Sequence, residues 1–308
     1  MKSFFTIAII ILFSFNSFSQ ELSEKQLSKF KNGEIALLEY MNMFAYDTIP
    51  FETRVKNIHD FIPRFVGLLK EKNSFLYPFD SLRYISKITS PDNSFKIFTW
   101  ELVEPLGTHR YYGAIQFNSK NLQIIPLFDY SDTMEYHTQK TLTPSNWYGC
   151  IYYNCELTID ENGKKYYNLF GLDRGDFISN IKILDIMTFD DQTNVEFGAK
   201  PLIYFYTLDV LYKKETRLFL EYYDKSVVHL NYNKVKEEIV YDHVTPPNEK
   251  QKDAKFSYIP DGTYEGLKWN KNFWKSIYRV FKYSIGKPDS PPMPAPQNNS
   301  RKKDMFGN

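Results

Sequence analysis

The pair with the clearest chemical potential is Asp242-His243, at the end of an apolar run that predicts a strand. A histidine beside a carboxylate at a strand end can act as a general base or as a ligand. Adjacent residues of one strand face opposite sides of a sheet, so we expect these two side chains not to contact each other. The alternative is a histidine at the sheet rim, before the turn Thr245-Pro246-Pro247.

Loop acids are the other candidates for site chemistry. Two groups could collect a calcium ion through carboxylates and carbonyls: Asp129, Asp132 and Glu135 in one, Asp190 and Asp191 in the other. Neither group follows the ligand order of an EF-hand, so solvated loop acids are the favoured interpretation. Three histidines lie too far apart in the chain for a metal-ligand spacing: His109, His137 and His229.

Standard catalytic motifs are missing from the sequence. It contains no G-x-S-x-G elbow, no H-E-x-x-H pair, no Walker loop and no G-x-G-x-x-G turn. A hydrolase assembled from distant loops stays open, since glycosidases need only two carboxylates. We expect no cofactor and no metal.

Cys150 and Cys155 are the two cysteines of the chain. In an extended strand, residues five apart point to opposite faces and lie about 16 Å apart, too far for a disulfide. A bridge would need a bulge or turn between them. Two buried free thiols are the favoured interpretation, and a disulfide is the alternative.

The N-terminus has the features of a secretory signal. Lys2 precedes an apolar run over residues 4–15, which is shorter than the roughly 20 residues that span a membrane. Small residues at Ser17 and Ser19 predict cleavage before Gln20. An uncleaved anchor is the alternative. We expect an exported protein, periplasmic or extracellular after cleavage.

Composition excludes two classes. Lys2 is the only charge before Gln20, so the mature chain would hold 37 basic and 37 acidic residues. A neutral chain has no overall positive field to hold a nucleic-acid backbone, which argues against general nucleic-acid binding and leaves a local basic patch as the alternative. With 43% hydrophobic residues it can bury a core, which excludes overall disorder.

The pattern of apolar residues predicts a β-rich body after two helices. Helical spacing covers residues 21–45 and 51–69. Short β-branched and aromatic runs then alternate with turns. They predict strands at Tyr84–Thr89, Phe95–Val103, Arg110–Phe117, Gln123–Phe128, Trp147–Ile159, Lys165–Leu172, Leu202–Leu211, Thr216–Tyr223, Val227–Tyr232 and Glu238–His243. The run Ile178–Met187 fits either a strand or a short helix.

Aromatic residues make up 18% of the chain and admit a functional interpretation. Exposed rings could form a platform for sugars or peptides, although core packing is favoured. One aromatic pattern occurs twice: Tyr111-Tyr112-Gly113-Ala114-Ile115 and Trp147-Tyr148-Gly149-Cys150-Ile151. Two similar strands explain this better than a repeat array.

Several aromatic and turn motifs stand out along the chain: Ser90-Pro91-Asp92-Asn93-Ser94-Phe95-Lys96-Ile97-Phe98-Thr99-Trp100, Trp147-Tyr148-Gly149, Tyr167-Asn168-Leu169-Phe170-Gly171-Leu172-Asp173, Tyr241-Asp242-His243 and Pro260-Asp261-Gly262-Thr263-Tyr264. Together they resemble a family of uncharacterised exported bacterial proteins. The resemblance covers roughly residues 85–270. The resemblance implies export and a β-rich body, and it implies no particular activity.

The C-terminal region predicts one more helix and a tail. Trp269, Phe273, Ile277 and Phe281 recur every four residues. Basic residues recur every three or four positions in the same segment: Lys268, Lys271, Lys275, Arg279 and Lys282. Such a basic amphipathic helix would dock on the β-body or, through residues 264–283, contact an anionic membrane surface. Gly286 and Pro288 end it.

These patterns divide the chain into five parts: a signal peptide, 1–19; a helical segment, 20–80; an antiparallel β domain, 81–263; an amphipathic helix, 264–285; and a disordered tail, 286–308. The β domain is expected to be an antiparallel meander forming a sandwich, barrel or partial propeller. We expect a non-enzymatic binding or structural module of the bacterial envelope, with an envelope macromolecule or glycan as partner and no nucleic acid. The alternative is a secreted hydrolase of glycan or peptide that uses loop carboxylates or His243.

Overall fold

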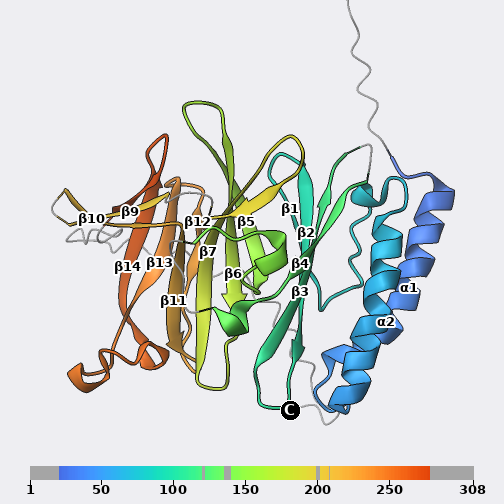
Figure 1. Ribbon diagram of the computed structural model, residues 1–308, viewed down its shortest axis with the longest axis horizontal. Helices are drawn as coiled ribbons and strands as arrows, with labels where there is room; N and C mark the ends of the chain where they lie inside the picture. Colours follow the sequence, from blue (N-terminus) through green and yellow to red (C-terminus); the bar gives the residue numbers. More distant parts are fainter. Residues whose placement is uncertain (1–20, 120–121, 135–139, 199–201, 208, 278–308) are drawn as a thin grey trace, which may run out of the picture.

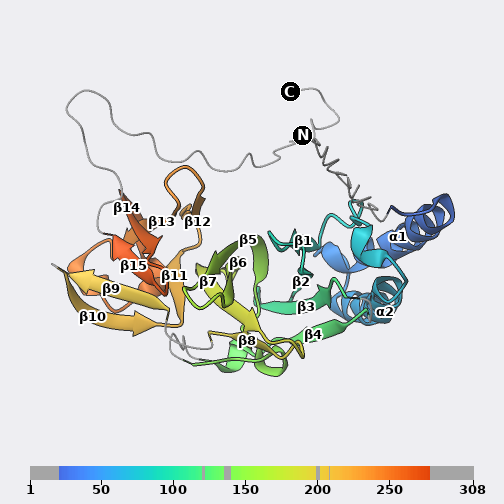
Figure 2. The same cartoon turned by 90° about the horizontal axis from the view of Figure 1, so that it is seen from above.

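The computed structural model describes residues 21–119, 122–134, 140–198, 202–207 and 209–277. Two helices and three β-sheets follow one another as four layers (Figure 1; Figure 2). The predicted mainly β fold with two N-terminal helices is therefore confirmed. The predicted signal peptide and the tail 286–308 lie outside the described residues.

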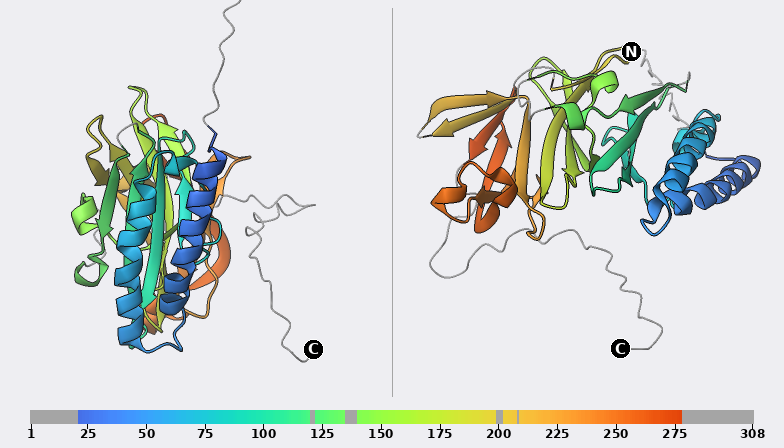
Figure 3. Two further views of the ribbon diagram at one scale, coloured as in Figure 1. Left: turned by 90° about the vertical axis from the view of Figure 1, so that its right-hand side faces the viewer. Right: turned by 60° about the horizontal axis from the view of Figure 1, so that its bottom comes forward.

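The helical layer consists of α1 (Glu24–Ala45) and α2 (Phe51–Leu69). Ser23 and Gln26 form a capping box at the start of α1, which satisfies two otherwise free N–H groups. Both helices cover one face of the first sheet, as the left view of Figure 3 shows. The rings of Phe61 and Phe65 pack edge-on against Trp100 of that sheet, with centroids 5.9 and 6.1 Å away.

The first sheet is an antiparallel meander in the order β1-β2-β3-β4. Its strands are β1 (Ser86–Thr89), β2 (Phe95–Val103), β3 (His109–Phe117) and β4 (Ile124–Phe128). The second sheet has the order β11-β7-β6-β5, with β8 on β7. Its strands are β5 (Ile151–Ile159), β6 (Lys165–Asp173), β7 (Ser179–Phe189), β8 (Val195–Phe197) and β11 (Arg217–Tyr223).

The third sheet is the layer at the opposite end from the helices, and its strand order is β10-β9-β15-β14-β13-β12. Its strands are β9 (Ile203–Thr207), β10 (Val210–Glu215), β12 (Leu230–Asn233), β13 (Glu238–Thr245), β14 (Ile259–Trp269) and β15 (Trp274–Ile277). Neighbours are antiparallel except β15 and β9, which are parallel. The path of described strands has two ends in each sheet, so the observed arrangement is a stack of open sheets.

The inner sheets are buried on both faces. In β2, Ile97 packs toward the second sheet, while Phe98 and Trp100 pack toward the helices. In β7, Ile183 faces the first sheet and Leu184 faces the third. A strand covered on both sides has no polar face, so its sequence lacks the usual alternation. This explains why the run Ile178–Met187 fitted both a strand and a helix; it is a strand.

The predicted C-terminal helix is wrong over residues 264–277, which form β14 and β15; residues 278–285 lie outside the described part. Trp269 and Trp274 are opposite each other in this hairpin. Asn270 N donates to Phe273 O across the turn, where Lys271 has a φ of 57°. The four-residue spacing of Trp269 and Phe273 spans a turn and imitates a helical period. The membrane contact expected for residues 264–283 depended on an amphipathic helix, and residues 264–277 do not form one.

One predicted strand is two strands. The run Leu202–Leu211 divides into β9 and β10, and Asp209 before β10 has a φ of 63°. The short β8 and the pair β14 and β15 had no predicted counterpart. The segment Phe95–Val103, in contrast, matches β2 at both ends.

Candidate functional site

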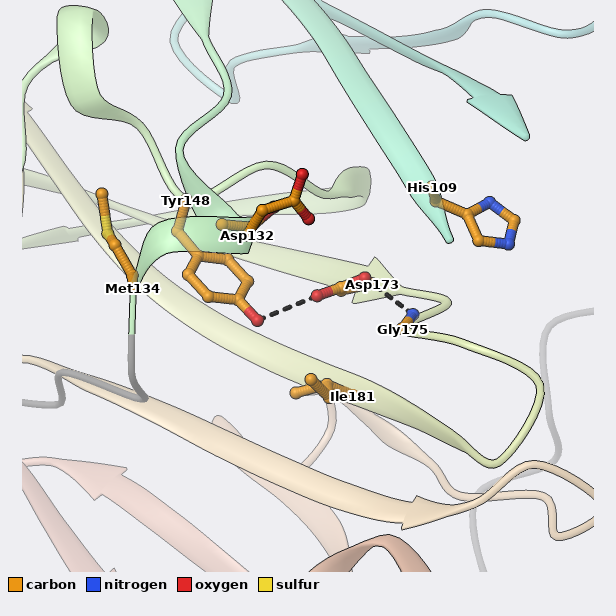
Figure 4. A pocket seen from close by; sticks show the side chains of 8 residues that line it. His109, Asp132, Met134, Tyr148, Asp173, Gly175 and Ile181 are labelled. Atoms are coloured by element: carbon orange, nitrogen blue, oxygen red, sulfur yellow. Dashed lines mark hydrogen bonds between the residues drawn. The ribbon is translucent and has the colours of Figure 1, made fainter. Parts of the chain in front are cut away.

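A small polar pocket lies where the first and second sheets meet, near the start of β3 and the end of β6. Its volume is about 180 Å³. Eight residues line it: His109, Ser131, Asp132, Met134, Tyr148, Asp173, Gly175 and Ile181 (Figure 4). They come from β3, from the loops around β4 and β5, and from β6 and β7. The pocket therefore depends on the stacking of two sheets.

Asp173 is the buried carboxylate of this pocket. Tyr148 Oη donates to Oδ2 at 2.8 Å, while Tyr111 Oη and Gly175 N donate to Oδ1 at 2.9 and 2.8 Å. Burial raises the pKa of Asp173, and the three donors oppose this rise. Tyr111 Oη also accepts from Arg174 N at 2.7 Å. Asp173 thus joins β6 to β3 and to the segment before β5.

The other polar groups of the pocket point elsewhere. His109 Nδ1 lies 3.1 Å from Glu101 Oε2, and Arg174 Nε lies 3.0 Å from Glu101 Oε1. In Figure 4 the His109 ring and the Asp132 carboxylate both extend away from the Asp173 carboxylate. Burial and the charge of Asp129 raise the pKa of Asp132. An acid–base reaction needs its proton donors and acceptors to converge on one atom, and these groups do not.

The first group of loop acids caps turns. Asp129 Oδ1 accepts from Ser131 N, Ser131 Oγ and Gly149 N, and its Oδ2 accepts from Tyr111 N at 2.8 Å. Glu135 lies outside the described residues. In the second group, Asp190 accepts from Gln192 N and from Asn194 N, both at 2.9 Å. Among the described residues no set of three His, Cys, Asp or Glu side chains is placed to hold a metal ion.

The candidate pair Asp242-His243 separates into two contacts in the third sheet. Asp242 is buried and its Oδ2 accepts from His229 N at 2.6 Å and lies 3.0 Å from His229 Nδ1. His243 Nδ1 lies 2.8 Å from Asp261 Oδ2, and Thr263 Oγ1 donates to Asp261 Oδ1 at 2.7 Å. The Thr263 hydroxyl therefore contacts the Asp261 carboxylate. Activation of a nucleophile needs a hydroxyl on the imidazole instead.

The two thiols lie inside the protein and are not bridged. Both belong to the core between the first and second sheets. Burial raises the pKa of Cys150 and of Cys155 well above the ordinary thiol value. A buried thiol with a raised pKa is a packing residue and not a nucleophile.

The ribbon formed by β9 and β10 lies at the other end of the layers (Figure 2) and carries exposed apolar, aromatic and basic side chains. Three consecutive apolar side chains of the edge strand β10 are exposed: Val210 by 66%, Leu211 by 37% and Tyr212 by 64%. Lysine ammonium groups lie over the rings of β9. Lys214 Nζ is 4.8 Å from the Tyr204 centroid, and Lys275 Nζ is 4.8 Å from the Tyr206 centroid.

Neither the pocket nor this ribbon could be located from the sequence. The repeated aromatic pattern held a partial signal, since Tyr111 and Tyr148, one from each copy, both donate to Asp173. For the ribbon, the signal is the apolar run Val210-Leu211-Tyr212 followed directly by two lysines.

No helix in the described part of the chain combines the length and apolar character needed to cross a membrane. Comparison with protein-family models, with curated proteins and with solved structures finds no match in any of the three.

Proposed function

We propose that this chain is an exported, non-catalytic module of the bacterial envelope that binds another protein through the β9–β10 ribbon. The basic start, the short apolar run and Ser17 and Ser19 support export. The observation that carries the binding function is the exposure of Val210, Leu211 and Tyr212 on an edge strand. Soluble proteins avoid three consecutive exposed apolar residues on such an edge unless a partner covers them.

A protein partner fits this ribbon better than a glycan. A sugar ring stacks on a free aromatic face. The Tyr204 ring is not free, because Phe273 stacks on it at a centroid distance of 4.3 Å and the Lys214 ammonium group lies over it at 4.8 Å. Lys213 lies over Phe205 in the same way, 5.6 Å from the centroid. The exposed residues that remain are aliphatic side chains and the Tyr212 ring, which suit a protein interface.

The ribbon resists simple addition of a partner strand. The register shifts between Leu211 and Lys213, which leaves an irregularity at Tyr212. Bulges and lysines are the devices that keep edge strands from pairing. The partner therefore contacts side chains of β10, and its complementary surface is apolar.

Site-specific photo-crosslinking in the native cells tests this proposal. We expect p-benzoylphenylalanine at Tyr212 to give one discrete adduct with an envelope protein, which mass spectrometry identifies. The same group at Tyr84, which is 46% exposed beside the helical layer, is the matched control and should not give that adduct. Val210→Ser/Leu211→Ser should abolish the adduct and weaken binding of the purified partner by at least tenfold.

Three outcomes would contradict the proposal. Crosslinking at both tyrosines alike would show that the contact is unspecific. A self-adduct with a dimer in light scattering would identify a second copy as the occupant. Titration of envelope polysaccharide that shows binding dependent on Tyr212 would favour a glycan partner instead.

A further inference from the structure

Arg54 is a buried cation that has no counter-ion among the described residues. It lies near the start of α2, on the same buried stripe as Ile58 and Phe61, and is only 5% exposed. Its Nε is buried and has no hydrogen-bond partner. No carboxylate of the described residues forms an ion pair with it. Buried donors without acceptors are rare in folded proteins, and a buried charge without a counter-ion is rarer.

The guanidinium lies at the N-terminal end of α2. Helical side chains lean toward the N-terminus, and Arg54 Cζ lies 5.5 Å from the ring centroid of Phe51, the first residue of the helix. Pro50 at the N-cap provides no side-chain hydrogen bond. The first intrahelical bond runs from Arg54 N to Pro50 O at 3.1 Å, so the N–H groups before Arg54 have no helical acceptor.

Both features favour negative charge in the same place. The N-terminus of a helix carries free N–H donors and the positive end of the helix dipole. A guanidinium adds a fork of donors that matches two oxygens of a carboxylate or phosphate. The acid of the first turn, Glu52, is exposed and forms no ion pair with Arg54.

We propose that Arg54 and the free N–H groups of the first turn of α2 bind a small oxyanion, the carboxylate or phosphate group of a ligand. The bound oxygens give the guanidinium its counter-charge and cap the helix. The site lies in the helical layer, at the opposite end of the molecule from the β9–β10 ribbon, and does not depend on the function proposed for that ribbon (Figure 2).

Arginine-detected NMR of the whole protein tests this site directly. The Nε–Hε resonance of Arg54, assigned by its loss in Arg54→Lys, is followed during separate titrations with sodium phosphate, sodium acetate and sodium chloride at constant ionic strength. We expect a saturable downfield shift with phosphate or acetate and none with chloride. The two oxyanion arms show whether a phosphate or a carboxylate is the preferred group. A resonance that responds to neither oxyanion would overturn the proposal.

Thermal unfolding gives an independent measurement. The Tm of the wild type should rise with the logarithm of oxyanion concentration, as mass action requires for a ligand of the folded state. Arg54→Met should lose this dependence and keep an equal or higher Tm without oxyanion, because it removes a buried charge that lacks a counter-ion. Arg64→Met is the matched control, since Arg64 lies on the same helix, is exposed and pairs with Asp60; it should keep the dependence. Equal dependence in wild type and Arg54→Met would overturn the proposal. If Arg54→Met fails to fold, the NMR titration of the wild type decides.

Discussion

Arg217 and Asp185 form an ion pair inside the protein: Nε lies 3.1 Å from Oδ1, and each side chain is 1% exposed. The two residues are opposite each other on β11 and β7. Two further guanidinium donors, on Nη1 and Nη2, reach the carbonyl oxygens of Lys140 and Phe197, at 2.7 and 3.0 Å. Tyr152 Oη donates to the second oxygen of Asp185 at 3.3 Å. Both charges are thus hydrogen-bonded, which is the condition for burying them.

Removing one charge of this pair should be severely destabilising. Arg217→Met leaves the Asp185 carboxylate buried without a counter-ion, and we expect it to lower the free energy of unfolding by about 3–5 kcal/mol. Arg217→Met/Asp185→Leu should recover most of that loss. Urea unfolding followed by circular dichroism measures both. Lys268→Met is the control: it breaks the pair between this exposed lysine and Glu238, at 3.2 Å, and should change stability by less than about 1 kcal/mol. A loss of similar size in the control would contradict the argument.

Gly171 makes room for a buried thiol. A Cβ at this position would lie 2.6 Å from Cys150 Sγ, inside a fully packed core. Gly171→Ala should therefore lower the free energy of unfolding by about 1–3 kcal/mol. Gly171→Ala/Cys150→Ala should be less destabilised than the two single changes predict together, because the second change removes the clash. Gly67→Ala is the control: no atom lies within 4 Å of its added Cβ, and alanine favours the helix by about 1 kcal/mol.

The parts of the fold that were predictable are those in which local pattern and tertiary environment agree. The apolar stripes at α1 and α2 meet one sheet face, so a period of 3.6 identified them. The strand at β2 is bounded by explicit turns, which fixed both ends. The error at residues 264–277 arose because Trp269 ends one strand of a hairpin and Phe273 lies in its turn, yet their four-residue spacing imitates a helical stripe. The pairing of β14 with β13 and of β15 with β9 is what distinguishes a hairpin from a helix in this segment.

The site was less predictable for a related reason. Asp173 accepts a hydrogen bond from Tyr111, which belongs to a different sheet and lies sixty-two positions earlier in the chain. No local pattern encodes that contact. Arg54 is different, since its place seven residues before Phe61 puts an arginine on the apolar stripe of α2. A charged residue on a buried stripe is a signal that sequence inspection can detect.

Lys182 should give the protein a pH-dependent stability. Burial and the nearby charge of Arg174 lower the pKa of Lys182 to about 8, from its ordinary value near 10.5. The folded state therefore releases this proton near pH 8, while the unfolded state keeps it up to about pH 10.5. Between these values the unfolded state binds more protons, so stability rises with pH. Urea unfolding from pH 7 to pH 10.5 should show that rise in the wild type relative to Lys182→Met.

Other groups titrate in the same range, so the comparison of variants carries this prediction. Lys182→Met should also be the more stable protein near pH 7, because it removes a charge that burial disfavours. Lys234→Met changes an exposed lysine and should leave the pH profile of the wild type unchanged. Parallel profiles for wild type and Lys182→Met would show that Lys182 titrates as an ordinary surface lysine.

The cysteines give a prediction that separates two free thiols from a disulfide. Cys150 and Cys155 are buried, and burial raises the pKa of each thiol, so the reactive thiolate is scarce and shielded in the folded state. Without reductant, the folded protein should react with a thiol reagent such as Ellman's reagent at least a hundredfold more slowly than the unfolded protein. Unfolding in denaturant should then release two equivalents of chromophore per chain. A released amount near zero, which rises to two only after reduction, would establish a bridge instead. Cys155→Ser should halve the final amount if both thiols are free. In a bridged protein the same change would expose one new thiol, because Cys150 would lose its partner.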